Sequence, residues 1–151
     1  MPQLHLKVVT PERVMFDEDI TSVSLPTPDG QITVLPNHIP LVTMITPGEL
    51  IVRAEKAQKI SLVYGGFVYI EADGLITIMA DSAEHLEELN EKEIEDAKRR
   101  AEDLKKKAVT IEEQVSAEAA LARSIAQLKT LRKHRHTSTK NIGIDQTNRH
   151  E

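Results

Sequence analysis

Residues 65–79 read GGFVYIEADGLITIM, and this stretch decides the fold class of the first half of the chain. Two runs rich in β-branched and aromatic residues are separated by Asp73-Gly74. Asp-Gly pairs tolerate the positive φ angles of tight turns, so the stretch predicts two strands joined as a hairpin. The second run, residues 75–79, is apolar on both faces, which indicates either simple core packing or a face kept for a partner.

The same pattern recurs through the rest of the first half. Alternation in residues 4–8 and 23–25 predicts further strands, and Asp29-Gly30 predicts another hairpin. We expect roughly nine short strands in an antiparallel sandwich or barrel, because strands this closely spaced leave no room for crossover helices. His5 should occupy an exposed strand position.

Proline and glycine mark where this pattern ends. All 7 prolines lie at or before Pro47, and residues 75–142 contain neither proline nor glycine. Two capping signals follow, Asn90 with Glu93 and Thr110 with Glu113. The second half therefore predicts an antiparallel hairpin of two helices, the second ending near Arg132. Polar residues without periodicity then predict a disordered tail over residues 137–151.

Apolar residues at helical spacing predict a seam between the two helices. These residues are Ile94, Ala97, Ala101, Leu104 and Ala108 in the first helix, and Ile111, Val115, Ala119, Ala122 and Ala126, with Leu121, Ile125 and Leu128 beside them, in the second. Most of them are small, and isolated helices of this length are marginal in water. The hairpin should therefore need other surfaces to hold it, which indicates a mobile element.

The composition excludes several function classes. The 151 residues carry a net charge of −5, contain no cysteine and are only 3% aromatic. This composition disfavours non-specific binding of duplex nucleic acid, stacking on single strands, thiol catalysis and cysteine-ligated zinc. No apolar run approaches the roughly 20 residues that span a bilayer, and we expect no signal peptide.

No catalytic or cofactor motif is present, so we expect neither an enzyme nor a bound cofactor or metal. His134 and His136, with His150 further on, could bind a metal weakly, although a solvated tail explains them better. His38 lies between two prolines in LPNHIPL, residues 35–41. A rigid loop of this kind suits contact with a partner better than proton transfer, since no partner carboxylate is evident.

Between Ala119 and Lys140 the basic residues are Arg123, Lys129, Arg132, Lys133, Arg135 and Lys140, with no acidic residue. One interpretation is a solvated face whose cations favour a helix C-terminus. A second is a cationic prong for an acidic protein surface. Nucleic acid is a third, opposed by the acidic first helix and β half.

Four ordered segments resemble the epsilon subunit of F-type ATP synthases over about residues 3–133. They are VTPER at 9–13, GQITVLPNHIPL at 30–41, GGFVYI at 65–70 and IMADSAE at 78–84. The resemblance implies an α+β protein, with an antiparallel β-sandwich of about ten strands before the helical hairpin. The expected parts are a docking domain at 1–87, a regulatory arm at 88–136 and the tail at 137–151.

The resemblance also implies a function. Members of this family are non-catalytic central-stalk (rotor) subunits that couple proton flow through the c-ring to ATP synthesis. The sandwich would bind the gamma subunit and the c-ring, with Gln31 and His38 at the c-ring contact. Here Gln31 stands where glutamate is usual and Thr33 where glycine is usual. The family acts at the membrane periphery; a bacterial inner membrane, cytoplasmic side, is assumed.

The hairpin would restrain ATP hydrolysis by contacting the catalytic alpha/beta hexamer. The residues implied in contact with the beta subunits are Arg123, Lys129, Arg132, Lys133 and Arg135. Some relatives bind ATP through an [IL]-D-x-x-R-A motif, which here reads LNEKEI, residues 89–94. Because Glu93 replaces a cation that would meet phosphate, we expect ATP binding to be weak or absent. The alternatives are a free nucleotide sensor and an unrelated β-domain with a basic prong for nucleic acid.

Overall fold

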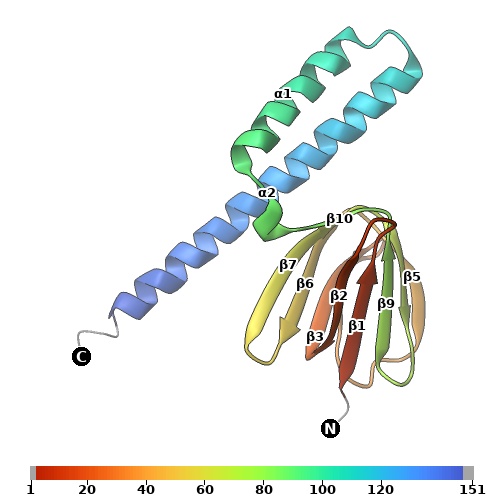
Figure 1. The fold of residues 1–151 in the computed structure, drawn as a ribbon, viewed down its shortest axis with the longest axis vertical. Coiled ribbons are helices and arrows are strands. Elements are labelled where there is room, and N and C mark those ends of the chain that lie inside the picture. The colour runs from red at the N-terminus through yellow and green to blue at the C-terminus, as the bar shows by residue number, and fades with distance from the viewer. Residues whose placement is uncertain (1–2, 148–151) are drawn as a thin grey trace. The chain divides into compact units, whose positions relative to one another are not determined.

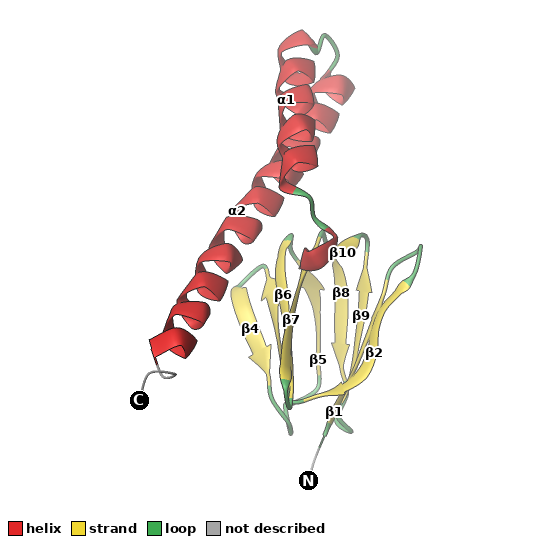
Figure 2. Cartoon of the chain, turned by 60° about the vertical axis from the view of Figure 1, so that its left-hand side comes forward, coloured by secondary structure: helices red, strands yellow, loops and turns green. Residues whose placement is uncertain are grey.

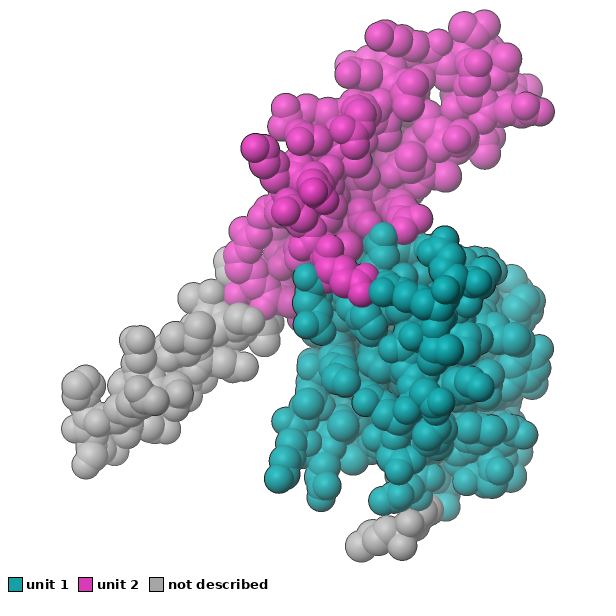
Figure 3. All heavy atoms as spheres, in the orientation of Figure 1, with its two compact units in different colours: residues 1–87 teal, residues 88–151 magenta. Residues whose placement is uncertain are grey.

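The computed structural model describes residues 3–147, with side chains described as far as residue 135. The chain divides into two compact units, Met1–Glu87 and Glu88–Glu151 (Figure 3). Each unit has its own secondary structure, strands in the first and helices in the second, so the two are described separately.

The first unit consists of two five-stranded sheets packed face to face (Figures 1 and 2). The strand orders are β2-β1-β9-β8-β5 in one sheet and β10-β7-β6-β3-β4 in the other. The strands are β1 Leu4–Val9, β2 Val14–Ile20, β3 Ser22–Thr27, β4 Gly30–Val34, β5 Leu41–Ile45, β6 Gly48–Ala54, β7 Ala57–Val63, β8 Gly66–Ile70, β9 Leu75–Ala80 and β10 Ala83–His85. The predicted sandwich is confirmed.

One strand pair differs from the antiparallel prediction. Strands β1 and β9 run parallel, with Leu6 opposite Ile76, whereas the other pairs in both sheets are antiparallel. The two strands lie near opposite ends of the unit's sequence, so no turn joins them. Turn residues reveal only pairings between strands that follow each other, which is why the sequence did not indicate this one.

Alternating side chains of the strands fill the space between the sheets. In β1, Leu4, Leu6 and Val8 are each at most 1% exposed, whereas Lys7 lies on the outer face. Nineteen buried residues form one core. They are Leu4, Leu6, Val8, Met15, Phe16, Ile20, Val23, Leu25, Val34, Ile45, Leu50, Val52, Val63, Val68, Ile70, Ile76, Ile78, Ala80 and Ala83. Aliphatic side chains dominate it, as the low aromatic content predicts.

The hairpin predicted at Asp73-Gly74 joins β8 to β9. The Glu71 carbonyl accepts from the Gly74 N–H at 3.1 Å, and the Asp73 carboxylate accepts from the Leu75 N–H at 3.1 Å. Gly74 has φ +93°, a conformation that glycine adopts without steric cost. At the start of β8, glycine is required at position 66 for a steric reason. A Cβ there would lie 2.1 Å from the carbonyl oxygen of Met79.

The second unit is the predicted helical hairpin. A 3₁₀ turn, Leu86–Glu88, leads to α1, Glu91–Lys107, and α2 spans Ile111–Thr147. Asn90 Oδ1 accepts from the Glu93 N–H at 3.2 Å, and Thr110 Oγ1 accepts from the Glu113 N–H at 3.1 Å. Both predicted N-caps are therefore confirmed.

The second helix extends beyond the predicted end near Arg132. Its backbone is helical to Thr147, because an established helix adds further residues at low cost and the segment contains no proline. Residues 148–151 lie outside the described part of the chain, as do the side chains of residues 136–147. Three expectations from the sequence fall largely on this segment. They are the disorder of residues 137–151, the weak metal ligation considered for His136 and His150, and the end of the basic run at Lys140.

The predicted seam is correct in part in each helix. In α1, Ile94 and Ala101 are buried, but Leu104 is 61% exposed. In α2, Leu128 is buried as predicted, whereas the buried Ala117 and Ser124 were not among the predicted positions. Other predicted positions of α2 are exposed, including Ile111 at 79%, Val115 at 60% and Ile125 at 47%. Periodicity alone does not decide which neighbouring positions on a helix are packed, because that depends on the side chains of both elements that meet.

Candidate docking surfaces

The loop that carries His38 forms a tight turn between β4 and β5. The His38 N–H donates to the Leu35 carbonyl at 3.1 Å, and Asn37 has φ 69°. Proline at the second position with a positive φ at the third is the pattern of a type II turn. The two prolines of LPNHIPL predict extended geometry for this loop, and that prediction is wrong at Asn37.

This turn fixes the orientation of the His38 ring. His38 Nδ1 lies 2.6 Å from the Ile39 carbonyl oxygen, so Nδ1 carries the proton that it donates. On either side, Leu35 is 57% exposed and Ile39 is 73% exposed. The loop therefore presents one oriented imidazole between two apolar side chains, an arrangement suited to a protein contact.

Gln31 and His38 are not brought together. Gln31 is exposed near the start of β4, opposite Pro26 of β3, whereas His38 lies beyond the last residue of the strand, Val34. At a rise of about 3.3 Å per residue, the strand separates Gln31 from Val34 by roughly 10 Å. The two predicted contact residues therefore belong to opposite ends of one edge strand.

The outer face of the β2-β1-β9-β8-β5 sheet carries a surface that the sequence only hinted at. We call it the apolar face and define it by Val42, Met44, Phe67, Tyr69 and Met79, which are 61%, 55%, 46%, 38% and 44% exposed. Strand register makes these residues neighbours, since Val42 pairs with Tyr69, Met44 with Phe67, and Phe67 with Met79.

An exposed apolar group of this kind on a sheet is typical of a binding surface. The two-faced apolar pattern of residues 75–79 had left core packing and a partner face open. In the structure Ile76 and Ile78 are fully buried while Met79 is 44% exposed, so β9 contributes to the core and to the apolar face.

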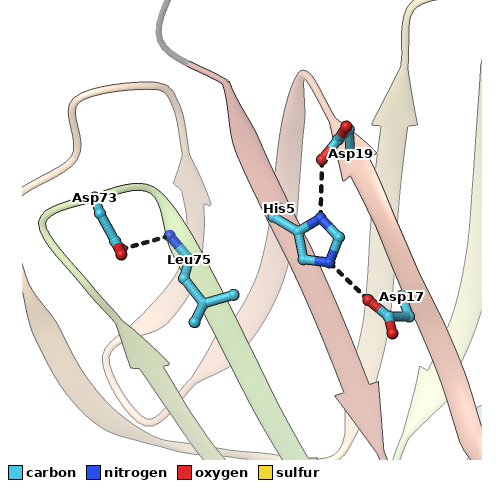
Figure 4. A network of polar contacts seen from close by, with 5 residues as sticks. All are labelled: His5, Asp17, Asp19, Asp73 and Leu75. Atoms are coloured by element: carbon cyan, nitrogen blue, oxygen red, sulfur yellow. Dashed lines mark hydrogen bonds and ion pairs between the residues drawn. The ribbon is translucent and has the colours of Figure 1, made fainter.

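Beside the apolar face, His5 of β1 lies between two carboxylates of β2 (Figure 4). His5 Nδ1 is 2.8 Å from Asp19 Oδ1, and His5 Nε2 is 2.6 Å from Asp17 Oδ1. Carboxylate oxygens accept, so the ring nitrogens of His5 are the donors. The hydrogen bonds that His5 donates to Asp19 and then to Asp17 raise the pKa of His5 above its usual value of 6.5.

His5 occupies the exposed strand position that the sequence predicted, with 42% of its side chain accessible. Its partners were missed, because they depend on the register between β1 and β2. The available signal was the Asp-x-Asp spacing of residues 17–19, which places both carboxylates on one face of a strand.

The basic residues predicted to contact the beta subunits lie on α2. Arg123, Lys129, Lys133 and Arg135 are exposed, and so is Arg132, with 60% of its side chain accessible. The structure does not present all of these residues as an unattached prong, because two of the arginines form ion pairs with α1.

Arg132 and Arg135 are the two arginines that pair with α1. Arg132 Nη2 lies 3.6 Å from Glu95 Oε1, and Arg132 Nε lies 3.9 Å from Glu91 Oε1. Arg135 also contacts the Glu91 carboxylate. In this conformation, therefore, part of the predicted basic surface is neutralised by the first turns of α1.

Where α1 ends and α2 begins, a hollow of about 570 Å³ opens between the helices. It is lined by Leu104, Lys107, Ala108, Glu112, Glu113, Ser116, Ala117 and Ala120. Within the described part of the chain, no three histidine, cysteine or acidic side chains gather as a metal site. No helix among the described residues is both long and apolar enough to cross a membrane.

Comparison with known proteins gives a consistent result. The family model for "ATP synthase, Delta/Epsilon chain, beta-sandwich domain" matches residues 3–86. An ATP synthase epsilon chain from Chromobacterium violaceum is 39% identical over 133 residues, covering 87% of this chain and 94% of the relative. One from Chloroflexus aggregans is 34% identical over 132 residues, covering 87% of this chain and 94% of that relative.

Solved structures share the fold. A chain of the Euglena gracilis mitochondrial ATP synthase, in a structure of its OSCP, F1 and c-ring, superposes with a TM-score of 0.70 at 23% identity, covering 80% of this chain and 76% of that one. A chain from the central stalk and c-ring of the Tetrahymena thermophila mitochondrial ATP synthase superposes with a TM-score of 0.56 at 16% identity, covering 85% of this chain and 96% of that one. The sandwich, the hairpin and the sequence relatives together show that this chain belongs to the family of ATP synthase epsilon chains.

Proposed function

We propose that this epsilon chain is a non-catalytic central-stalk subunit that couples proton flow through the c-ring to ATP synthesis and restrains ATP hydrolysis. Family membership supports this role, as does the fold shared with chains of stalk-containing assemblies. The sandwich, residues 1–87, serves docking, and the hairpin, residues 88–136, is the regulatory arm. Through the complex the chain lies at the periphery of the membrane, on the cytoplasmic side of a bacterial inner membrane.

The apolar face is the observation that carries the docking role, and we assign it to the gamma subunit. It consists of Val42, Met44, Phe67, Tyr69 and Met79 on adjacent strands of a rigid sandwich. Aromatic and methionine side chains are enriched at protein interfaces, and preformed rigid surfaces bind with little loss of conformational entropy.

The loop ends of the edge strand β4 supply the second contact, with the c-ring. His38 presents an oriented ring between exposed Leu35 and Ile39, and Gln31 offers an amide that can donate and accept. Because these residues lie at opposite ends of β4, they meet different parts of the ring surface. His38→Ala should lower coupled ATP synthesis more than Gln31→Ala, since the His38 ring is held in one orientation beside exposed apolar side chains.

The arm acts through its cations. Arg123, Lys129, Arg132, Lys133 and Arg135 are exposed on α2 and suit an acidic surface on the beta subunits. The hairpin buries few apolar side chains, so its closed and open states can differ by only a few kcal/mol, as a switch requires.

Co-purification with the gamma subunit tests the docking role. Phe67→Asp places a charge in the apolar face and should abolish the complex, since an unpaired charge in an interface is strongly unfavourable. Ala57→Asp is the matched control, because Ala57 is an exposed apolar residue on β7 of the other sheet. Loss of binding with Phe67→Asp alone supports the assignment. Equal binding by both variants, with the sandwich still folded, would reject it.

A further inference from the structure

Two acidic and two basic side chains meet at the open end of the hairpin, away from the link between α1 and α2. Glu91 and Glu95 lie in the first turns of α1, and Arg132 and Arg135 lie on α2. Arg132 reaches both carboxylates, at 3.9 and 3.6 Å, and Arg135 contacts Glu91. These four residues are called the latch below.

Among the described residues of the hairpin, little buried apolar surface holds this end closed. The buried apolar side chains are Ile94, Ala101, Ala117 and Leu128, and two of these four are alanines; Ser124, Gln127 and Thr130 of α2 are buried polar side chains. The opposite end is closed covalently by residues 108–110, and Lys105 lies 3.9 Å from Glu118 there. Separation of the helices would therefore begin at the latch, where the chain imposes no constraint.

Single ion pairs on a protein surface contribute little, but charges that share partners in a network contribute more. Glu91 is the centre of this network, since it contacts both arginines and only 31% of its side chain is accessible. Its place in the first turn of α1 also favours a negative charge, because the helix dipole is positive at that end. The helix dipole therefore acts on the Glu91 side chain in the same direction as the two arginines do.

We infer that the latch closes the hairpin without any bound ligand, and that it withholds Arg132 and Arg135 from an acidic partner surface until the helices separate. An acidic partner offers the arginines the same kind of bond that Glu91 and Glu95 offer. Opening then exchanges one set of carboxylates for another, so that the two states remain close in free energy. The withholding of the arginines rests on the proposed inhibitory function, whereas the closing of the hairpin by the latch does not.

Distance measurement between spin labels on the full-length chain tests the closing role. The chain contains no cysteine, so Lys92→Cys and Ile125→Cys introduce the only labelling sites. Both positions are accessible and neither belongs to the latch. The variants are Glu91→Gln/Glu95→Gln, the acid reversal Glu91→Lys/Glu95→Lys, the base reversal Arg132→Glu/Arg135→Glu, and the combination of both reversals.

The matched control is Glu93→Lys. Glu93 is exposed in the same first turn, so its reversal has the same effect on net charge and on the helix dipole as reversal at Glu91. Circular dichroism shows whether each variant keeps its helices. The neutral pair Glu91→Gln/Glu95→Gln keeps the test decisive if a reversal should unfold the arm.

The wild-type chain and Glu93→Lys should show one short distance, as expected for helices packed about 8–10 Å apart. Each single-sided reversal should raise the ratio of open to closed hairpin about tenfold, and high salt should do the same more weakly. The combined reversal should restore the short distance. An unchanged distance in the reversals, or no restoration in the combination, would overturn the latch.

ATP hydrolysis by the assembled complex tests the withholding role. Glu91→Gln/Glu95→Gln keeps every arginine and removes the two negative charges of the latch that Arg132 and Arg135 contact, so hydrolysis should become several-fold slower than with the wild-type chain. If the label distance responds but hydrolysis does not fall, the latch stands and the inhibitory function fails. If the distance does not respond, the latch fails whatever the rate of hydrolysis.

Discussion

The sandwich and the hairpin are stabilised in different ways. Nineteen buried residues form one core between the two sheets, whereas the buried apolar side chains in the described part of the hairpin are Ile94, Ala101, Ala117 and Leu128. Within each sheet the strands are also hydrogen-bonded to their neighbours, while ion pairs link α1 to α2 at the open end of the hairpin. We expect the sandwich to keep its shape and the hairpin to open more readily.

Hydrogen exchange should show this contrast as the largest effect. Backbone amides at Val68 and Ile78 exchange only on unfolding of the sandwich, whereas the amide at Ala101, which is bonded within α1, exchanges whenever that helix unfolds. A difference of about 3 kcal/mol in opening free energy makes exchange at Ala101 about a hundredfold faster. Similar rates at all three sites would show that the two units unfold as one.

The next largest effect should be a difference in the free energy of unfolding between matched leucine truncations in the two units. Leu6 is fully buried in the sandwich, and Leu104 is 61% exposed in α1. Leu6→Ala should lower the free energy of unfolding by about 2–5 kcal/mol through lost burial and the cavity left behind. Leu104→Ala should change it by less than about 0.5 kcal/mol. Chemical denaturation followed by circular dichroism measures both, and a large effect at Leu104 would indicate a hidden packing partner.

The helix caps should matter more to the hairpin than to the sandwich. Asn90→Ala removes the acceptor of the Glu93 N–H and Thr110→Ala that of the Glu113 N–H, each at a cost of about 1 kcal/mol. Because the hairpin is marginal, either change should lower helical circular dichroism at constant sandwich content. Glu112→Ala, exposed in the first turn of α2, is the control. Equal loss in the control would contradict a capping role.

The smallest expected effect is a dependence of the stability of the sandwich on pH. Asp19 and Asp17 raise the pKa of His5 in the folded state. A raised folded-state pKa gives stability that is complete below the unfolded value near 6.5 and is lost as the pH rises through the folded value. The melting temperature should therefore fall slightly between mildly acidic and alkaline pH. His5→Gln should flatten this slope, and a slope that persists in the variant would assign it to other groups.

The sequence predicted those features that depend on neighbours along the chain. Asp73-Gly74 identified a turn, alternation identified strands, and Asn90 and Thr110 identified the caps. The parallel pairing of β1 with β9 and the contacts of His5 depend on register between strands, which no local pattern encodes.

The packed side of α2 was predicted only in part, for a related reason. Leu128 is buried as predicted, but Ile111 and Val115 are exposed and Ala117 and Ser124 are buried instead. The choice depends on the side chains that meet and on the charges of α1 that pair with α2, and both require the two helices side by side.

The sequence assigned Gln31 and His38 to one predicted contact, but their separation along β4 appears only in the structure.

ATP hydrolysis by the complex assembled with a chain that ends at Glu88 tests the central contrast most directly. This truncation removes the hairpin and keeps every residue of the sandwich core. We predict that the sandwich still co-purifies with the gamma subunit and that hydrolysis becomes several-fold faster. Retained assembly with an unchanged rate of hydrolysis would contradict the division into a docking unit and a restraining arm.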